Sequence, residues 1–133
     1  MHYDHQVQVR YGETDQMGVV HHANYLLYFE EARTAFLAHH GQPYGQLEKD
    51  GFALPVRKLD LRFRAPAHYE DVLRVRVSVD RITAASVRFV YEIKRPSDDT
   101  LIATGSTELA CIDLNANPRR PHVLPEAMRE LFG

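Results

Sequence analysis

Apolar positions along the chain follow two different periods, one helical and one alternating. Between residues 25 and 37 they recur every three or four positions, which places them on one side of a long helix. Asn24 is a residue type that begins helices, and Gly41 is a type that ends them. The start is set only to within a few residues, so His22 and Ala23 could already belong to the first turn. The predicted apolar stripe consists of Tyr25, Leu26, Phe29, Ala32, Phe36 and Leu37.

On both sides of this helix, apolar and polar residues alternate, which is typical of half-buried strands. One such run, Gln6–Tyr11, precedes the helix and has Val7, Val9 and Tyr11 on one face. Turn-forming residues separate the runs that follow, and Gly105 in the last run marks a bulge or a close backbone approach. The later segments are predicted to be a long connection over 42–52 with at most one helical turn, strands over 57–64, 74–80, 87–94 and 101–114, and a short helix over 125–132.

The order of these elements predicts the class of fold. A helix with one strongly apolar side needs a sheet to cover it, and strands that alternate this cleanly have one buried and one solvated face. We therefore expect an α+β protein, in which an antiparallel five-stranded sheet wraps around one long central helix. The length suits a single domain over residues 1–133.

Composition limits the class of protein further. The chain is 44% hydrophobic and 26% charged, which is typical of a soluble globular protein. No apolar run approaches the ~18 residues of a membrane span. Residues 1–20 lack the pattern of a signal peptide, so we expect a cytoplasmic protein. A net charge of −2 argues against a nucleic-acid partner. The single Cys111 excludes an internal disulfide and, among apolar neighbours, is predicted to be a buried, inert thiol.

A polar loop carrying a carboxylate, Asp15, comes just before the predicted helix. The first N–H groups of a helix have no partner within it, so they can receive the negative charge that develops on a carbonyl oxygen. A carboxylate beside them either attacks that carbonyl or deprotonates a water molecule. The alternative for Asp15 is a solvated loop residue that caps the following turn. Gly18 allows a close approach or a positive φ, and the amides from Val19 to Ala23 would supply the N–H donors.

Two adjacent histidines lie between this loop and the helix. The imidazole of His22 is a candidate to orient water, Asp15 or a leaving group, and its alternative is a residue that only packs or caps. His21 is expected to line the site without taking part in the chemistry. A metal site built from Asp15 and both histidines is disfavoured, because adjacent histidines do not have a recognisable ligand spacing.

The residues around Asp15 also resemble a known family. The segment Tyr11–Arg33 reads Y-x-x-T-D-x-x-G-V-V-x-H-A-N-Y-L-x-Y-F-E-x-A-R. This pattern resembles the signature of hotdog-fold acyl-CoA thioesterases, and within them the 4-hydroxybenzoyl-CoA thioesterase family and its YbgC-like branch. Segments Pro66–Asp71 and Arg120–Pro125 are similar to the family as well, so the resemblance spans nearly the whole chain. It implies a hotdog fold and the hydrolysis of an acyl-CoA to a free carboxylic acid and coenzyme A.

The resemblance also implies roles for single residues. It makes Asp15 the catalytic carboxylate, as general base or nucleophile, and makes a backbone N–H at the position of His22 the group that polarises the thioester carbonyl. The YbgC-like branch has a histidine there, which favours His22 as a second catalytic candidate. Tyr11, Thr14 and Asn24 either hold the loop or contact the substrate.

Contacts to coenzyme A are expected further along the chain. Ser86 follows the turn at which family members contact the nucleotide, and positive side chains should surround the phosphates, with Arg81 and Arg119 among the candidates. The 4-hydroxybenzoyl-CoA branch has paired arginines just before this serine, whereas this chain has Thr83–Ala85. That difference leaves specificity for an aromatic acyl group open.

The resemblance implies an assembly but no added cofactor. It implies a homodimer whose sheets join edge to edge, commonly paired into a homotetramer, with sites at subunit interfaces, and an exposed sheet edge favours pairing on physical grounds too. No metal or redox cofactor is implied, because coenzyme A enters as part of the substrate. The acyl chain length, and the choice between coenzyme A and acyl carrier protein as the carrier, stay open. The rival functions are a hotdog dehydratase and a non-catalytic module that binds acyl-CoA or acyl carrier protein.

Overall fold

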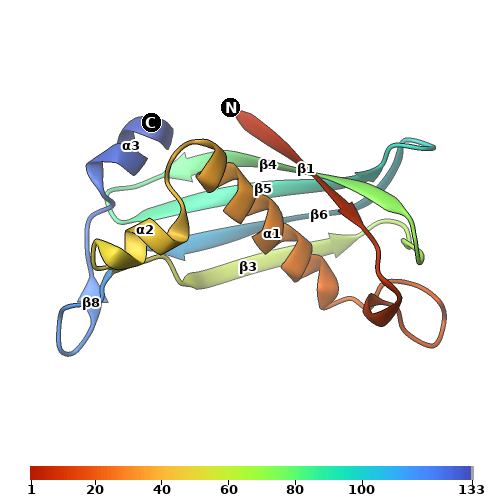
Figure 1. Cartoon of the computed structure of the whole chain (residues 1–133), viewed down its shortest axis with the longest axis horizontal. Helices are drawn as coiled ribbons and strands as arrows, with labels where there is room; N and C mark the ends of the chain where they lie inside the picture. The colour runs from red at the N-terminus through yellow and green to blue at the C-terminus, as the bar shows by residue number, and fades with distance from the viewer. Residues whose placement is uncertain (133) are drawn as a thin grey trace.

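The computed structural model describes residues 1–132 and arranges them as a curved antiparallel sheet around one helix (Figure 1). The sheet has five strands in the order β1-β4-β5-β6-β3, and α1 lies across one of its faces. This confirms the predicted α+β hotdog architecture. The elements are β1 (His2–Gln8), α1 (Asn24–His39), β3 (Val56–Phe63), β4 (Val72–Ile82), β5 (Ser86–Arg95) and β6 (Thr100–Ala110).

Smaller elements gather at one end of the sheet, beside the turn between β4 and β5 (Figure 1). They include a second sheet of three two-residue strands, which alternation cannot reveal because two residues do not establish a period. The predicted strand over 101–114 is wrong at its end, because β6 stops at Ala110. The short C-terminal helix is confirmed. These elements are α2 (Tyr44–Lys49), β2 (Phe52–Ala53), β7 (Ile112–Asp113), β8 (Arg120–Pro121) and α3 (Glu126–Phe132). None of the described helices is both long and apolar enough to cross a membrane.

Of the two predicted ends of α1, the C-terminal end is confirmed and the N-cap residue is wrong. Gly41 has a φ of +77°, a conformation that favours glycine, and it ends the helix as predicted. Asn24 is not the N-cap, because Ala23 occupies that position and Asn24 is already helical. Its side-chain amide instead donates to the Glu13 carbonyl oxygen at 2.8 Å. The helix start is therefore tied to the preceding loop, where η1 (Tyr11–Glu13) forms a single turn.

The apolar stripe of α1 fills the space against the sheet. Of its six predicted residues, only Leu26 is not fully buried. Phe29 stacks on Tyr91 of β5, with ring centroids 4.2 Å apart and planes 9° apart. Cys111 is fully buried as predicted, and burial raises the pKa of its thiol. The strand prediction is wrong for Tyr11, which lies beyond the end of β1 and is 76% exposed.

Strand β3 also departs from the expected pattern of one buried face. Leu59 and Phe63 remain 49% and 55% exposed, although alternation predicted that they would be buried. The reason is the position of α1, which packs against β1 and β4 near the opposite edge of the sheet. Leu59 and Phe63 are therefore left largely uncovered, although Leu61 between them packs against the core. The outer edge of β3 has no neighbouring strand among the described residues.

Gly105 confirms the predicted close approach. It lies opposite Tyr91 in the pairing of β5 with β6. A Cβ atom added to Gly105 would lie 2.5 Å from the Asp60 carbonyl oxygen and 2.7 Å from the Phe29 ring. We expect Gly105→Ala to lower the free energy of unfolding by about 1–3 kcal/mol, because neither backbone nor a stacked ring gives way easily.

Urea unfolding measures this effect. The matched control is Gly12→Ala, since a Cβ at Gly12 would have no neighbour within 4 Å, and its unfolding free energy should change by less than about 0.5 kcal/mol. Equal unfolding midpoints for Gly105→Ala and the wild type would contradict the close approach.

Candidate active site

The loop before α1 folds into a narrow hairpin that fixes Asp15. The Asp15 N–H donates to the Val19 carbonyl oxygen, and the His21 N–H donates to the Glu13 carbonyl oxygen, both at 2.9 Å. At the tip, the Gly18 N–H donates to the Asp15 carbonyl oxygen at 2.9 Å. Gly18 has a φ of +78°, so glycine is the residue this turn favours. Asp15 thus sits on an ordered turn of the chain.

Two side chains of α1 donate hydrogen bonds to Glu13 in this hairpin. Asn24 donates to the Glu13 carbonyl oxygen, and the Tyr28 hydroxyl donates to Glu13 Oε1 at 2.9 Å. Burial and the adjacent Glu13 carboxylate both raise the pKa of Tyr28, so its phenol stays protonated and keeps donating. On the other side, the Val20 N–H donates to the Ala67 carbonyl oxygen at 2.9 Å. The position of Asp15 relative to the helix start is therefore fixed by several independent contacts.

The two oxygens of the Asp15 carboxylate are in different situations. Oδ1 accepts a hydrogen bond from the Met17 N–H at 2.8 Å, which is the turn-capping role weighed against catalysis. Oδ2 accepts no hydrogen bond from any residue in the described range, 1–132. The side chain is half-buried. Capping and chemistry are thus compatible, since the cap orients the carboxylate and leaves one oxygen available.

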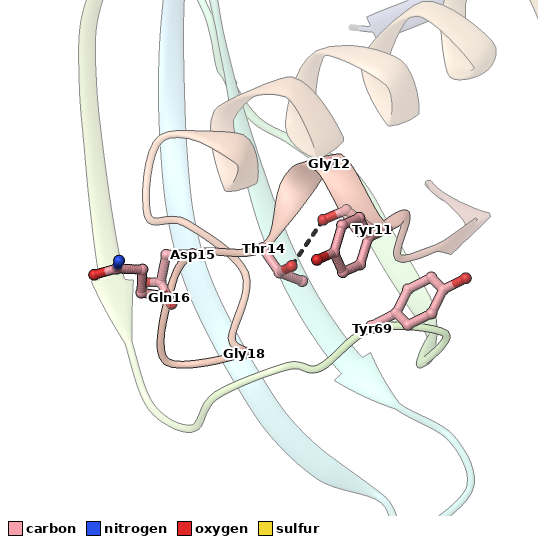
Figure 2. A pocket seen from close by; sticks show the side chains of 7 residues that line it. All are labelled: Tyr11, Gly12, Thr14, Asp15, Gln16, Gly18 and Tyr69. Atoms are coloured by element: carbon pink, nitrogen blue, oxygen red, sulfur yellow. Dashed lines mark hydrogen bonds between the residues drawn. The ribbon is translucent and has the colours of Figure 1, made fainter.

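A pocket of about 540 Å³ opens beside the hairpin. Figure 2 shows Asp15 and Gln16 on one side of the loop and the rings of Tyr11 and Tyr69 on the other. Four residues predicted from the sequence lie together here, and sequence reasoning missed Tyr69, whose ring meets that of Tyr11 edge-on at 5.6 Å. Tyr69 lies in a segment similar to the family, but no spacing indicated this contact. The lining residues are Tyr11, Gly12, Thr14, Asp15, Gln16, Gly18 and Tyr69.

Two side chains near this pocket donate hydrogen bonds to backbone carbonyl oxygens. The Thr14 hydroxyl donates to the Tyr11 carbonyl oxygen at 2.7 Å, so it closes the turn of η1 (Figure 2). Asn24 is likewise occupied by its bond to Glu13. Of the three residues that could either hold the loop or contact a substrate, only Tyr11 has an exposed side chain. Thr14 and Asn24 hold the loop.

The N–H donors at the helix start are fewer than the sequence suggested. Those of Val20 and His21 are occupied by carbonyl oxygens. The Val19 N–H has no acceptor among residues 1–132, but Val19 lies opposite Asp15 in the hairpin and not at the helix start. Within residues 1–132, the N–H groups of His22 and Ala23 donate to no acceptor. These two consecutive donors directly precede the first turn of α1, where the helix dipole adds partial positive charge.

The imidazole of His22 lies just before the N-terminus of α1. It is exposed, its ring lies 4.2 Å from that of His21, and it meets the ring of Phe63 edge-on at 6.5 Å. Phe63, at the end of β3, was not recognised as a site residue because alternation assigned it to the core. Its exposed ring adds an apolar surface beside the His22 imidazole.

Within one chain, the residues expected to bind coenzyme A lie far from Asp15. Arg81 is nine residues along β4 from Val72, roughly 30 Å away from the end that faces Asp15. It pairs with Glu108 at 3.3 Å. Ser86 is buried, and its hydroxyl bonds to that of Thr83 at 2.6 Å. Arg119 lines a second pocket of about 480 Å³ at the same far end. Among the described residues, no three histidine, cysteine or acidic side chains are grouped as metal ligands.

Comparison with known proteins identifies the family. Residues 9–132 match the family model described as the thioesterase-like superfamily. The putative acyl-CoA thioesterase YneP of Bacillus subtilis is 34% identical over 108 residues, which cover 81% of this chain and 78% of the relative. The acyl-CoA thioester hydrolase YbgC of Escherichia coli is 31% identical over 122 residues, covering 92% and 89% of the two chains.

A solved structure agrees with these relatives. A 1,4-dihydroxy-2-naphthoyl-CoA thioesterase from Synechocystis superposes with a TM-score of 0.92 at 28% identity, covering 99% of this chain and 96% of its own. The resemblance inferred from Tyr11–Arg33 is therefore confirmed. The chain belongs to the thioesterase-like superfamily.

Proposed function

We propose that this chain is an acyl-CoA thioesterase, which hydrolyses the thioester of an acyl-CoA to a carboxylic acid and coenzyme A. The observation that carries the proposal is an ordered carboxylate, Asp15, on a hairpin whose second strand leads directly into the unpaired N–H groups of His22 and Ala23 at the start of α1. The names of the relatives YneP and YbgC support the same activity.

Each part of the site has a step to perform. The thioester carbonyl oxygen would accept hydrogen bonds from the His22 and Ala23 N–H groups, which stabilise the negative charge formed during attack. Asp15 Oδ2 would take a proton from water, whose oxygen bonds to the carbonyl carbon. The C–S bond then breaks, and the proton passes to the departing sulfur. In the nucleophilic route, Oδ2 bonds to the carbonyl carbon, the C–S bond breaks and releases the coenzyme A thiolate, and water then hydrolyses the resulting anhydride, which frees the acid and the Asp15 carboxylate.

Two substitutions at His22 separate its backbone from its side chain. His22→Pro removes the N–H donor and should lower kcat by about 10²–10³-fold. His22→Ala keeps the N–H and removes the imidazole, so kcat should stay within about tenfold of wild type if the ring only assists. Both variants are compared by circular dichroism to check the fold. Equal losses in the two variants would assign the role to the imidazole instead.

We further propose a homodimer formed through the β3 edges. That strand has a free edge and bare apolar side chains, Leu59 and Phe63, which pairing would cover. In an antiparallel pairing about a two-fold axis, the far end of one sheet lies beside the Asp15 end of the other. Arg81, Ser86 and Arg119 would then approach the site of the neighbouring chain, where they could bind coenzyme A. Pairing of two such dimers into a tetramer stays a prediction.

The direct test of the function is release of free thiol from a panel of short, long and aromatic acyl-CoAs. We expect turnover of at least one member, and the preferred member identifies the acyl class. A parallel panel of acyl groups on acyl carrier protein distinguishes the two carriers. If no thioester is cleaved while the protein still binds coenzyme A, the chain is a binding module and the proposed hydrolysis is wrong.

A further inference from the structure

Strand β3 is exposed along almost its whole length. Every residue from Val56 to Phe63 except Leu61 is exposed. Natural edge strands usually carry a feature that prevents pairing with another chain, such as a proline, a very short length or a bulge. β3 has eight residues and no proline, and its register shift against β6 lies at its start, between Val56 and Lys58. Residues 58–63 therefore form a regular free edge that another strand can join.

The backbone groups that point outward from this edge belong to its apolar residues. In an antiparallel pair, alternate residues of a strand bond to one neighbour, and the residues between them point to the other side. The Arg64 N–H donates to the Ile102 carbonyl oxygen at 2.8 Å, which continues the register of β3 with β6. The even-numbered residues of β3 thus face β6. The N–H and C=O groups at the free edge are those of Leu59, Leu61 and Phe63.

A second copy of the chain, as partner, fits this edge in one register. Pairing keeps side chains of the same face together, so only a few registers are possible about a two-fold axis. With Leu61 opposite the partner's Leu61, Asp60 lies opposite the partner's Arg62 on the solvent face, twice in each dimer. Opposite charges in such cross-strand positions are stabilising. At the ends of the pairing, Lys58 lies opposite the partner's Arg64, a like-charge contact between exposed groups that solvent screens.

Both charged groups of this cross-strand pair are accessible in the single chain. The Asp60 carboxylate accepts a hydrogen bond from the Ser106 hydroxyl through Oδ2, and the same oxygen lies 3.8 Å from Arg88. The Asp60 side chain is nevertheless 60% exposed. Arg62 is also exposed and takes part in no ion pair among residues 1–132. Pairing therefore gives Arg62 an acidic partner that its own chain does not supply.

The same register covers the exposed apolar residues of the edge. It sets Leu59 opposite the partner's Phe63, so each covers the other. An axis at Asp60 or Arg62 would set each of those charges against its own copy. An axis at Leu59 would leave Phe63 opposite the partner's Pro55, which precedes β3. A strand of an unrelated protein would not require this self-complementarity, which favours a second copy of the chain as the occupant.

We propose that two chains pair in this register and that the partner's Leu59 thereby becomes part of the active site. Phe63 connects the two surfaces, because its ring centroid lies 6.5 Å from that of His22 and 5.7 Å from that of Tyr25, on either side of the start of α1. With the partner's Leu59 against Phe63, an apolar surface from both chains lies beside the helix start. This role rests on the proposed thioesterase function, in which that surface contacts the hydrocarbon part of the acyl group.

Single cysteines along β3 test the register without an enzyme assay. A residue meets its own copy only if the two-fold axis passes through its position, and a disulfide needs Cα atoms about 4.4–6.8 Å apart. Under mild oxidation, Leu61→Cys should form a covalent dimer several times faster than Leu59→Cys, Asp60→Cys or Arg62→Cys. The wild type should form none, because its free Cys111 is buried. Faster formation at another position would overturn the register, and no covalent dimer in any variant would overturn the pairing.

Charge reversal at Arg62 tests the ion pairs of this register. Arg62→Asp would set two carboxylates face to face twice in each dimer, so it should raise the Kd of the dimer by about tenfold or more. Adding Asp60→Arg restores opposite charges and should lower the Kd again.

The matched control is Arg129→Asp, an equal change of charge at an exposed residue of α3, which Figure 1 shows away from β3. Its Kd should stay within about twofold of the wild type. Analytical ultracentrifugation measures these constants. Equal Kd values for Arg62→Asp and the wild type would contradict the pairing of Asp60 with Arg62.

The role of Leu59 is tested first in the homodimer. Leu59→Ala should lower kcat/KM for octanoyl-CoA by about tenfold and for acetyl-CoA by less, because only the longer chain has hydrocarbon to place against this surface. An unchanged ratio of the two kcat/KM values would overturn the role of Leu59.

A mixed dimer then shows which chain supplies Leu59. Co-expression of Leu59→Ala chains with Asp15→Asn chains that carry a second affinity tag allows the mixed dimer to be isolated. Its one working site combines Asp15 of the Leu59→Ala chain with Leu59 of the other chain, so the wild-type substrate ratio should return. A ratio as low as that of the Leu59→Ala homodimer would overturn the role across the interface. Covalent dimers of Leu61→Cys without any turnover would contradict the proposed hydrolysis, and with it the role of Leu59, while the register would stand.

Discussion

Asp15→Asn is expected to lower kcat on an acyl-CoA by about 10²–10⁴-fold. The amide has nearly the shape of the carboxylate, and its oxygen can still accept the hydrogen bond that Oδ1 receives from the Met17 N–H. The hairpin should therefore persist, with Gly18 still bonded to the residue 15 carbonyl. What is lost is the capacity to take a proton from water or to attack the thioester, so KM should change far less than kcat.

The control for this variant is Asp4→Asn. Asp4 lies on β1 in an ion pair with Arg76 at 2.8 Å, remote from the hairpin, and Arg76 lowers the pKa of its carboxyl group. Its loss should leave kcat unchanged, since an exposed ion pair contributes only about 0–1 kcal/mol to stability. If Asp15→Asn kept near wild-type turnover while Asp4→Asn did the same, Asp15 would be a turn cap and nothing more.

Phe29→Ala should lower the free energy of unfolding by about 3–5 kcal/mol. The ring is fully buried, stacks on Tyr91, and lies over Gly105, where no other side chain can fill the space. Truncation thus leaves a cavity that the sheet cannot close, and it removes an aromatic pair as well. A loss of this size is a large part of the roughly 5–15 kcal/mol that stabilises a typical domain.

Urea unfolding at one fixed protein concentration measures the effect. Thr34→Ala, a truncation on the exposed side of the same helix, should change the unfolding free energy by less than about 0.5 kcal/mol. An equal loss in both variants would contradict a specific contribution from the packing of Phe29 against Tyr91 and Gly105.

Sequence periodicity predicted those features of the fold that depend on the residues of one helix or strand alone. The stripe from Tyr25 to Leu37 predicted the buried side of α1, because helical geometry fixes which positions face the same way. Alternation predicted the strands but not which faces are covered. Leu59 and Phe63 of β3 show the limit, since a period of two distinguishes two faces, and the position of α1 decides whether either is buried.

The candidate site was predicted in part for a similar reason. Asp15, Gly18 and the amides before α1 are close in sequence, so their proximity follows from local chain geometry. Tyr69 reaches the same pocket from a distant segment, and Phe63 meets the His22 ring from the end of β3. Neither fact has a signature in spacing, because both depend on long-range packing.

The bare edge of β3 has a consequence for how stability is measured and maintained. If two chains cover that edge only when paired, folding and association are one equilibrium, and mass action sets the midpoint of thermal unfolding. The midpoint should then rise with protein concentration. A separated chain would present an unpaired strand with apolar side chains, which is a template for uncontrolled aggregation. For such a protein, dilution acts as a denaturant.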